Sequence, residues 1–159
     1  MNALRIISGG QTGVDRAALD AALAAGVPCG GWCPGGRMAE DGPLPPRYPL
    51  TELPGSGYIE RTRANVADSD GTVILHGDRL EGGTLQTRLF CEELGKPCLV
   101  IARETTDIAA AADTIADFIG SHDIRSLNVA GPRASKQPQM YEWAHAVISR
   151  LLERTRAAA

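Results

Sequence analysis

Short apolar runs alternate with segments of helical periodicity along the whole chain. The apolar runs predict strands that end at Ile7 and that cover 27–32, 72–75, 98–102 and 126–130. The helical segments begin at Gly13, span 58–67, end at Leu94, span 107–119 and begin again near Pro138. Continuous apolar strands separated by helices are typical of a parallel sheet covered on both faces. The pattern therefore predicts an α/β fold, a doubly wound parallel sheet of about five strands in a Rossmann-like three-layer αβα arrangement.

The segment 33–57 interrupts this alternation. It carries prolines among glycines and charged residues, at positions 34, 43, 45, 46, 49 and 54. Proline removes a backbone donor and fixes φ, so no regular element is expected there. A loop of this length inside a compact domain is usually a lid or a binding segment, and we expect an ordered, functional loop. The 159 residues fit one Rossmann-like domain over 1–159, with residues 154–159 frayed.

Three of the predicted strands end in glycines next to polar side chains. These strand ends are Gly9-Gly10-Gln11-Thr12-Gly13, Gly82-Gly83-Thr84, and Gly131 with Arg133 and Lys136. The carboxyl ends of parallel strands lie at one edge of the sheet, where ligands bind in this class of fold. Glycine turns that open helices bind phosphate through free N–H groups and the helix dipole. We therefore expect the three strand ends to form one anion site.

Other polar residues near the first turn add to this prediction. Thr12 and Asp15 are spaced as an N-cap and the acid of a capping box, so Asp15 is expected mainly as a helix cap. Arg61 and Asn65 share one face of the helix 58–67, whose N-terminal part can lean over the same edge of the sheet. Both are added to the predicted site. No catalytic residue and no metal ligand are assigned.

The glycine turns differ from well-known nucleotide motifs. The first turn reads GGxxG rather than GxGxxG, and no acid closes a second strand about 20 residues later, which argues against a nicotinamide dehydrogenase. No glycine is followed by Lys-Ser or Lys-Thr in the Walker spacing, which argues against ATP hydrolysis. The turns therefore predict an anion site of a less common kind.

Composition and charge narrow the possible partners. The formal net charge is −3, from 16 Lys and Arg against 19 Asp and Glu, and the sequence has no basic cluster, so nucleic-acid binding is not expected. The sequence shows neither a membrane-spanning apolar run nor a signal-peptide pattern, so we expect a cytoplasmic protein without a membrane partner. The four cysteines lack CxxC spacing and the three histidines lie far apart. Reduced structural thiols are expected, and no metal centre.

Six segments together resemble a known family. They are ISGGQTGVDRAALDAAL, GGWCPGGRMAEDGPLPPRYPL, ERTRANVADSDGTVIL, EGGT, GKPCLV and LNVAGPRASK, spread over nearly the whole chain. They are similar to the molybdenum carrier family, within the superfamily of Rossmann-like nucleotide-binding proteins that includes the lysine-decarboxylase-like phosphoribohydrolases. The resemblance implies a homo-oligomer that holds molybdenum cofactor (molybdopterin) or a nucleotide by its phosphate and ring, with molybdoenzymes among its partners.

The same resemblance bears on catalysis. The phosphoribohydrolases carry a PGGxGTxxE motif, whose Glu takes part in the cleavage of a nucleoside monophosphate. The matching stretch here runs from Glu81 to Thr87, lacks the second glycine and has no acid at the position of that Glu. The resemblance thus favours a binding protein over a hydrolase of that type. Two alternatives remain open, a nucleotide hydrolase that uses Asp15, Glu40 or Asp41, and a module that senses a nucleotide.

Overall fold

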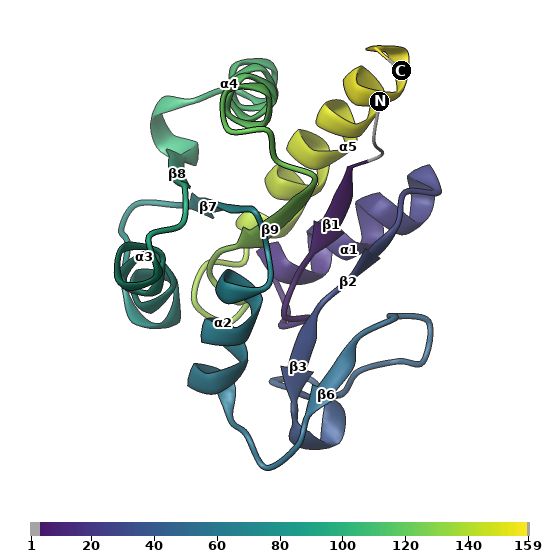
Figure 1. The fold of residues 1–159 in the computed structure, drawn as a ribbon, viewed down its shortest axis with the longest axis vertical. Helices are drawn as coiled ribbons and strands as arrows, with labels where there is room; N and C mark the ends of the chain where they lie inside the picture. The colour runs from purple at the N-terminus through teal and green to yellow at the C-terminus, as the bar shows by residue number, and fades with distance from the viewer. Residues whose placement is uncertain (1–3, 159) are drawn as a thin grey trace.

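The centre of the molecule is a five-stranded parallel sheet with the order β2-β1-β9-β7-β8 (Figure 1). The computed structural model describes residues 4–158. The strands are β1 (Arg5–Ile7), β2 (Cys29–Gly30), β7 (Gly71–His76), β8 (Cys98–Ala102) and β9 (Ser126–Ala130). β7 and β9 are almost completely buried, as expected for parallel strands covered on both faces. The Rossmann-like α/β fold predicted from the sequence is confirmed.

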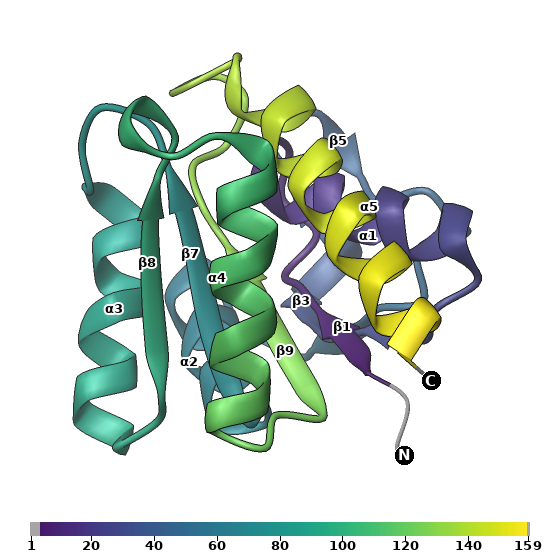
Figure 2. The same ribbon diagram turned by 90° about the horizontal axis from the view of Figure 1, so that it is seen from above.

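Helices cover both faces of this sheet (Figures 1 and 2). One face carries α1 (Val14–Ala25), α4 (Ile108–Ser121) and α5 (Met140–Ala158), and the other carries α2 (Tyr58–Ala67) and α3 (Gly82–Leu94). The buried face of α1 is rich in small residues, at Ala17, Ala18, Ala21 and Ala22. Small side chains let α5 and the sheet approach α1 closely, which places the N-terminus of α1 near the strand ends.

The last strand in the chain lies in the middle of the sheet. β9 pairs with β1 on one side and with β7 on the other. β1 leads into α1 on one face, whereas β7 leads into α3 on the other face. The chain therefore leaves the sheet in opposite directions on either side of β9, and open α/β sheets bind ligands at such a point. The ends of β1, β9 and β7 are neighbours at one edge of the sheet.

The segment 33–57 contains short regular elements, so the expectation that none forms there is wrong. They are β3 (Trp32–Pro34), η1 (Gly35–Arg37), β4 (Met38–Ala39), β5 (Gly42–Pro43) and β6 (Thr51–Leu53). β3 pairs in parallel with β6, and β4 pairs with β5. Pro34 is the last residue of β3 and Pro43 the last residue of β5, each in a two-stranded sheet, where a missing N–H is tolerated. The prolines thus limit the strands to two or three residues without preventing them.

A small second core holds this segment against α1. It consists of buried side chains that pack on Leu19, namely Cys33, Ala39, Leu44, Tyr48 and Leu50. The guanidinium of Arg37 donates hydrogen bonds of 2.9 to 3.3 Å to the carbonyl oxygens of Leu44, Pro45, Tyr48 and Leu50. The carbonyl oxygens of Pro45 and Tyr48 also accept backbone N–H groups, so Arg37 adds to these turn bonds and links the irregular stretch together.

Two further differences from the sequence expectations concern chain ends and breaks. The strand expected over 27–32 is divided at Gly31, whose φ is +134° and where a Cβ would lie 2.3 Å from the Ser8 carbonyl oxygen. α5 continues to Ala158, through most of the stretch expected to fray.

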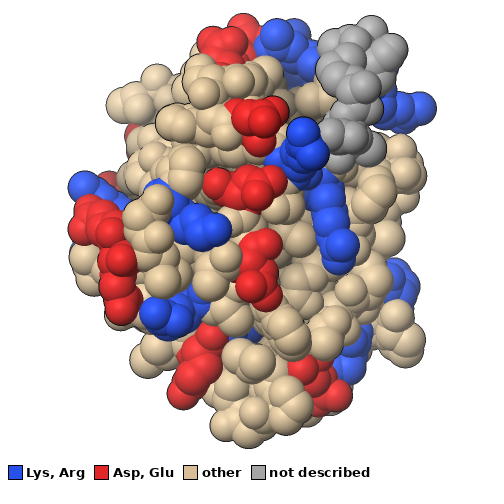
Figure 3. All heavy atoms as spheres, viewed as in Figure 1, with Lys and Arg blue, Asp and Glu red and all other residues tan. Residues whose placement is uncertain are grey.

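None of the helices within residues 4–158 is long and apolar enough to cross a membrane. Acidic and basic side chains alternate over the face drawn in Figure 3, without a continuous patch of one sign.

Candidate functional site

A cavity of about 470 Å³ lies at the carboxyl ends of β1, β9 and β7. Its wall combines residues that follow each of these strands with residues from the first half of α2. Small-molecule sites usually have volumes of about 300–1,000 Å³. The three glycine-containing segments singled out in the sequence therefore line a common cavity of ligand size.

The N-terminus of α3 offers free backbone donors to this cavity. Gly82, Gly83 and Thr84 form its first turn, and none of their N–H groups has an acceptor within residues 4–158. Glu81, the N-cap residue, makes no side-chain capping bond. A Cβ added to Gly82 or Gly83 would meet no atom within 4 Å, so the space beside them is open. Free N–H groups at the positive end of a helix dipole, next to open space, are suited to an anion.

The first glycine turn, in contrast, has most of its N–H groups bonded within the protein itself. The N–H groups of Gly10, Gln11 and Thr12 donate to side-chain oxygens of the same segment at 3.0 to 3.3 Å. The Val14 N–H donates to the Pro132 carbonyl oxygen at 3.3 Å. A phosphate at this turn would have to displace these protein acceptors. Gly13 and Asp15 also keep N–H groups without an acceptor among the described residues, but all three N–H groups in the first turn of α3 are free, so α3 is the less occupied of the two turns.

The capping box expected from Thr12 and Asp15 does not form, and that prediction is wrong. Gly13 is the N-cap residue, without a side-chain capping bond. Its φ is +82°, and a Cβ there would lie 2.3 Å from the Pro132 carbonyl oxygen, so only glycine fits this contact. The Thr12 hydroxyl donates to Glu40 instead. Asp15 remains in the first turn of α1, with its carboxylate in the cavity wall.

The segment that follows β9 contributes two cationic side chains. A Cβ on Gly131 would lie 2.3 Å from the Leu75 carbonyl oxygen, so the chain passes tightly against β7 at this point. Arg133 and Lys136 then line the cavity. Arg133 Nε lies 3.7 Å from Glu40 Oε2, whereas Lys136 forms no ion pair within the described part of the chain. Lys136 thus offers an uncommitted positive charge.

Arg61 and Asp15 form an ion pair in the cavity wall. Arg61 Nη1 lies 3.3 Å from Asp15 Oδ2, and the two side chains are 11% and 6% exposed. Arg61 also lies against the backbone of Gly9, where a Cβ would come within 1.9 Å of Nη1. Desolvation raises the pKa of Asp15 to about 6, against the opposing charges of Arg61 and Arg16. Asp15 therefore exchanges its proton close to neutral pH.

Eight of the residues predicted for the site line the cavity: Gln11, Arg61, Gly82, Gly83, Thr84, Gly131, Arg133 and Lys136. The structure places the other five outside its lining: Gly9, Gly10, Thr12, Gly13 and Asn65. Asn65 is buried, accepts the Trp32 N–H at 2.8 Å and donates to the Trp32 carbonyl oxygen at 3.0 Å. It fastens α2 to β3 and so holds Arg61, one helical turn earlier, in position.

Sequence reasoning missed part of the wall, in particular Tyr58, Ile59, Thr62, Arg79, Glu81, Gln86, Thr87 and Gln137. Tyr58 and Ile59 are 42% and 63% exposed, and the Arg61 guanidinium lies 5.8 Å from the Tyr58 ring centroid. The spacing of Tyr58 three residues before Arg61 was the available signal, because both lie on one helical face. Exposed aromatic and aliphatic side chains at the cavity suit a flat apolar ligand ring.

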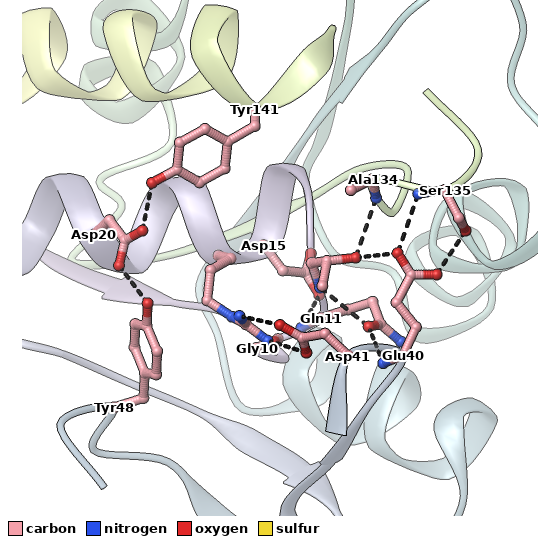
Figure 4. Close-up of polar contacts among 12 residues, drawn as sticks. Gly10, Gln11, Asp15, Asp20, Glu40, Asp41, Tyr48, Ala134, Ser135 and Tyr141 are labelled. Carbon is pink, nitrogen blue, oxygen red and sulfur yellow. Dashed lines mark hydrogen bonds and ion pairs between the residues drawn. The ribbon is translucent and has the colours of Figure 1, made fainter. Parts of the chain in front are cut away.

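Glu40 joins three chain segments behind the cavity wall (Figure 4). Its carboxylate accepts hydrogen bonds from the Ser135 N–H at 3.0 Å, from the Ser135 hydroxyl at 2.6 Å and from Thr12. Its own N–H donates to Gln11 Oε1 at 2.8 Å. Desolvation acts to raise the pKa of Glu40, but the hydrogen bonds from Ser135 and Thr12 outweigh it and lower the pKa. Within residues 4–158, no side chain of 33–57 lines the cavity.

Further contacts fasten the segment 33–57 to α1 and α5. Arg16 binds Asp41 through both terminal nitrogens, at 3.0 and 3.1 Å. Figure 4 shows Asp20 between the rings of Tyr48 and Tyr141, and both hydroxyls donate to its carboxylate, that of Tyr48 at 2.6 Å. These contacts tie the segment 33–57 to α1, to α5 and to the turns that line the cavity.

Positive charge predominates in the cavity wall. Four cationic side chains, Arg61, Arg79, Arg133 and Lys136, stand against the carboxylates of Asp15 and Glu81. Such an excess of positive charge attracts anions.

Within the described residues, no group of three or more His, Cys, Asp or Glu side chains is placed to hold a metal ion.

These features define a Rossmann-like α/β protein with an anion-type cavity where its strand connections diverge. The chain belongs to the circularly permutated YpsA SLOG family, whose model matches residues 6–152. Among solved structures it is similar to the "Putative molybdenum carrier protein" from Syntrophus aciditrophicus SB. The two chains share 47% identity and a TM-score of 0.92, over 95% of this chain and 96% of that chain. No curated protein matches the sequence. The family resemblance inferred from the sequence is confirmed.

Proposed function

We propose that this protein binds and carries a small heterocycle with a phosphate group, and that molybdenum cofactor is this ligand. The observation that carries the proposal is the first turn of α3, where three N–H groups have no acceptor among the described residues and the space beside Gly82 and Gly83 is open. The name of the similar protein from Syntrophus aciditrophicus SB supports the choice of cofactor. A nucleotide offers the same phosphate chemistry and is the alternative ligand.

The residues of the cavity fit such a ligand. The N–H groups of Gly82, Gly83 and Thr84 would hold the phosphate, with Lys136 as a counter-charge. The exposed side chains of Tyr58 and Ile59 would cover the ring. When bound, the cofactor supplies a pterin, a phosphate and molybdenum as cargo, and the described residues need not ligate the metal. This division would leave the metal free for ligands of the accepting protein.

The residue at the position of the phosphoribohydrolase Glu supports carriage over hydrolysis. Thr87 stands there, and its hydroxyl donates to the Gly83 carbonyl oxygen at 2.9 Å. It stabilises the first turn of α3 and offers no carboxylate to a substrate. The structure contains no observation that favours hydrolysis of that type over binding.

We extend the proposal to the assembly and the location of the protein. Leu85 and Leu89 on α3 are 39% and 46% exposed, which supports an interface between copies of the chain in a homo-oligomer. As a carrier, the protein would deliver the ligand to molybdoenzymes. We place this delivery in the cytoplasm. Sedimentation velocity of the full chain with and without ligand tests the assembly.

The proposed function is tested by anaerobic titration of the full chain with molybdenum cofactor and, separately, with nucleoside monophosphates. We expect saturable binding of one ligand per chain, weakened by competing inorganic phosphate and by higher salt. Native mass spectrometry of the chain purified from cells with active cofactor synthesis should show the ligand mass. Absence of saturable binding for every one of these ligands would overturn the proposal.

A further inference from the structure

The Asp15–Arg61 pair and the first turn of α3 line the same cavity but belong to segments that follow different strands. Arg61 rests on Gly9, directly after β1, whereas α3 follows β7. β9 separates these two strands in the sheet. Two strand spacings correspond to about 10 Å. With the phosphate of the ligand on α3, this strand separation leaves room for a different part of the ligand to face the pair.

Both members of the pair have unused hydrogen-bonding groups at the cavity. Arg61 has five N–H donors, of which only one, on Nη1, is bonded to a described residue. Its Nε is buried without an acceptor, while Nη2 is unbonded and not fully enclosed. Asp15 Oδ2 accepts the N–H of Gln11 and Arg61, whereas Oδ1 has no partner within residues 4–158 and is not fully enclosed. The pair thus presents a donor beside an acceptor.

A donor beside an acceptor is complementary to a lactam edge, in which a ring carbonyl lies next to a ring N–H. The carbonyl would accept from Arg61 and the N–H would donate to Asp15. A 4-oxopterin and a 6-oxopurine both have this edge. Adenine has the reverse arrangement, an amino group beside an unprotonated ring nitrogen. Its amino donor would face the Arg61 donor, and its ring nitrogen, an acceptor, would face the Asp15 acceptor. Buried polar groups left unpaired in this way reject a ligand strongly.

We propose that Asp15 and Arg61 select ligands whose ring carries a lactam edge, so that oxo-pterins and 6-oxopurines bind in preference to adenine compounds. This inference rests on the proposed function, because it assumes that the phosphate of the same ligand sits on α3. Asp15 and Arg61 are specificity-determining residues in this scheme. The phosphate contacts alone do not distinguish one ring from another.

Inosine 5′-monophosphate and adenosine 5′-monophosphate are the matched probes, since they differ only at this edge of the ring. Calorimetric titration of the full chain at about pH 8, where the Asp15 carboxylate is ionised, should show the inosine compound binding at least about tenfold more tightly. Ribose 5-phosphate, which lacks the ring, reports on the phosphate contacts by themselves. Equal affinities of the two nucleotides, with ribose 5-phosphate still bound, would overturn the ring selection and leave the proposed function intact. Failure of all three to bind would count against both.

Two substitutions on α1 separate recognition from folding. Asp15→Asn keeps the shape of the side chain but adds an amide donor that can face the adenine ring nitrogen, so the tenfold preference should shrink to about twofold or less. Asp20→Asn is the matched control, because Asp20 bonds Tyr48 and Tyr141 outside the cavity, and it should leave the ratio of affinities unchanged. Circular dichroism confirms that each variant is folded. An unchanged ratio in Asp15→Asn, or an equal loss of preference in both variants, would overturn the inference.

Discussion

Arg61 occupies the space that a side chain on Gly9 would need, since a Cβ there would lie 1.9 Å from Arg61 Nη1. The φ of Gly9 is outside the left-handed region, so this glycine is required by its neighbour and not by its own backbone conformation. The contact brings α2 onto the end of β1 and delivers the guanidinium to Asp15. One glycine after the first strand thus determines where a positive charge stands in the cavity.

We predict that Gly9→Ala weakens ligand binding while the fold is retained. The methyl group would displace the flexible end of Arg61 from Asp15, at a cost of about 1–3 kcal/mol in the free energy of unfolding. The affinity for inosine 5′-monophosphate should fall about tenfold, as measured by calorimetric titration. Gly120→Ala in α4 is the control, because a Cβ there meets no atom within 4 Å and the site is remote. Unchanged affinity in Gly9→Ala would show that Arg61 does not need this position.

We predict that Gly83→Ala stabilises the fold but weakens ligand binding, whereas Gly9→Ala weakens both. Gly83 lies in the first turn of α3, its φ is outside the left-handed region, and a Cβ there meets no atom within 4 Å. Alanine should therefore raise the free energy of unfolding, by up to about 1 kcal/mol. The methyl group enters open space at the cavity wall, so the affinity for ribose 5-phosphate should fall at least about fivefold.

The same Gly120→Ala variant serves as the comparison for Gly83→Ala, since it gives a similar gain in helix propensity without touching the cavity. Denaturant unfolding and calorimetric titration measure the two effects. A Gly83→Ala protein that binds ribose 5-phosphate as tightly as the natural chain would place the phosphate elsewhere.

Glu40 should influence binding without touching the ligand. Glu40→Gln removes the carboxylate that accepts hydrogen bonds from Ser135 and Thr12 and pairs with Arg133. The segment after β9, which lines the cavity, should therefore be held less firmly. We expect a loss of about 1–2 kcal/mol in unfolding free energy and a several-fold lower affinity for ribose 5-phosphate. Asp41→Asn is the control, since within residues 4–158 the Asp41 carboxylate bonds the Arg16 side chain and does not line the cavity, so the substitution should cost stability alone. Equal effects of both substitutions on affinity would contradict a positioning role for Glu40.

The sequence was informative where the signal is local. Apolar runs and helix spacing predicted the strands and helices, because each pattern is confined to a few neighbouring residues. Glycines with polar neighbours predicted which strand ends meet. The pattern did not show which turn keeps its N–H groups free, because that depends on side chains such as Ser8 and Asp15 folding back onto the first turn. The role of Glu40 was equally hidden, since its partners lie 28 and 95 residues away.

The pKa of Asp15 should be visible in the pH dependence of stability. Its value is about 6 in the folded protein, against 3.8 for the unperturbed group, because desolvation outweighs the charge of Arg61. Between these two values the folded state binds more protons than the unfolded state. The free energy of unfolding should therefore fall by roughly 2 kcal/mol as the pH rises from about 4 to about 6, and level off above about pH 7.

Subtracting the unfolding free energies of the natural chain from those of Asp15→Asn isolates this effect, because the other titrating groups cancel. The difference should grow by about 2–2.5 kcal/mol in favour of the variant between pH 4 and pH 7. Asp41→Asn provides a control of opposite sign. Its hydrogen bonds from Arg16 lower the pKa of Asp41, so that carboxylate stabilises the fold above its unfolded pKa and loses this effect as the pH falls through its folded value. A flat difference for Asp15→Asn would show that the carboxylate titrates at its ordinary pKa, and that the cavity wall at this point is open to water.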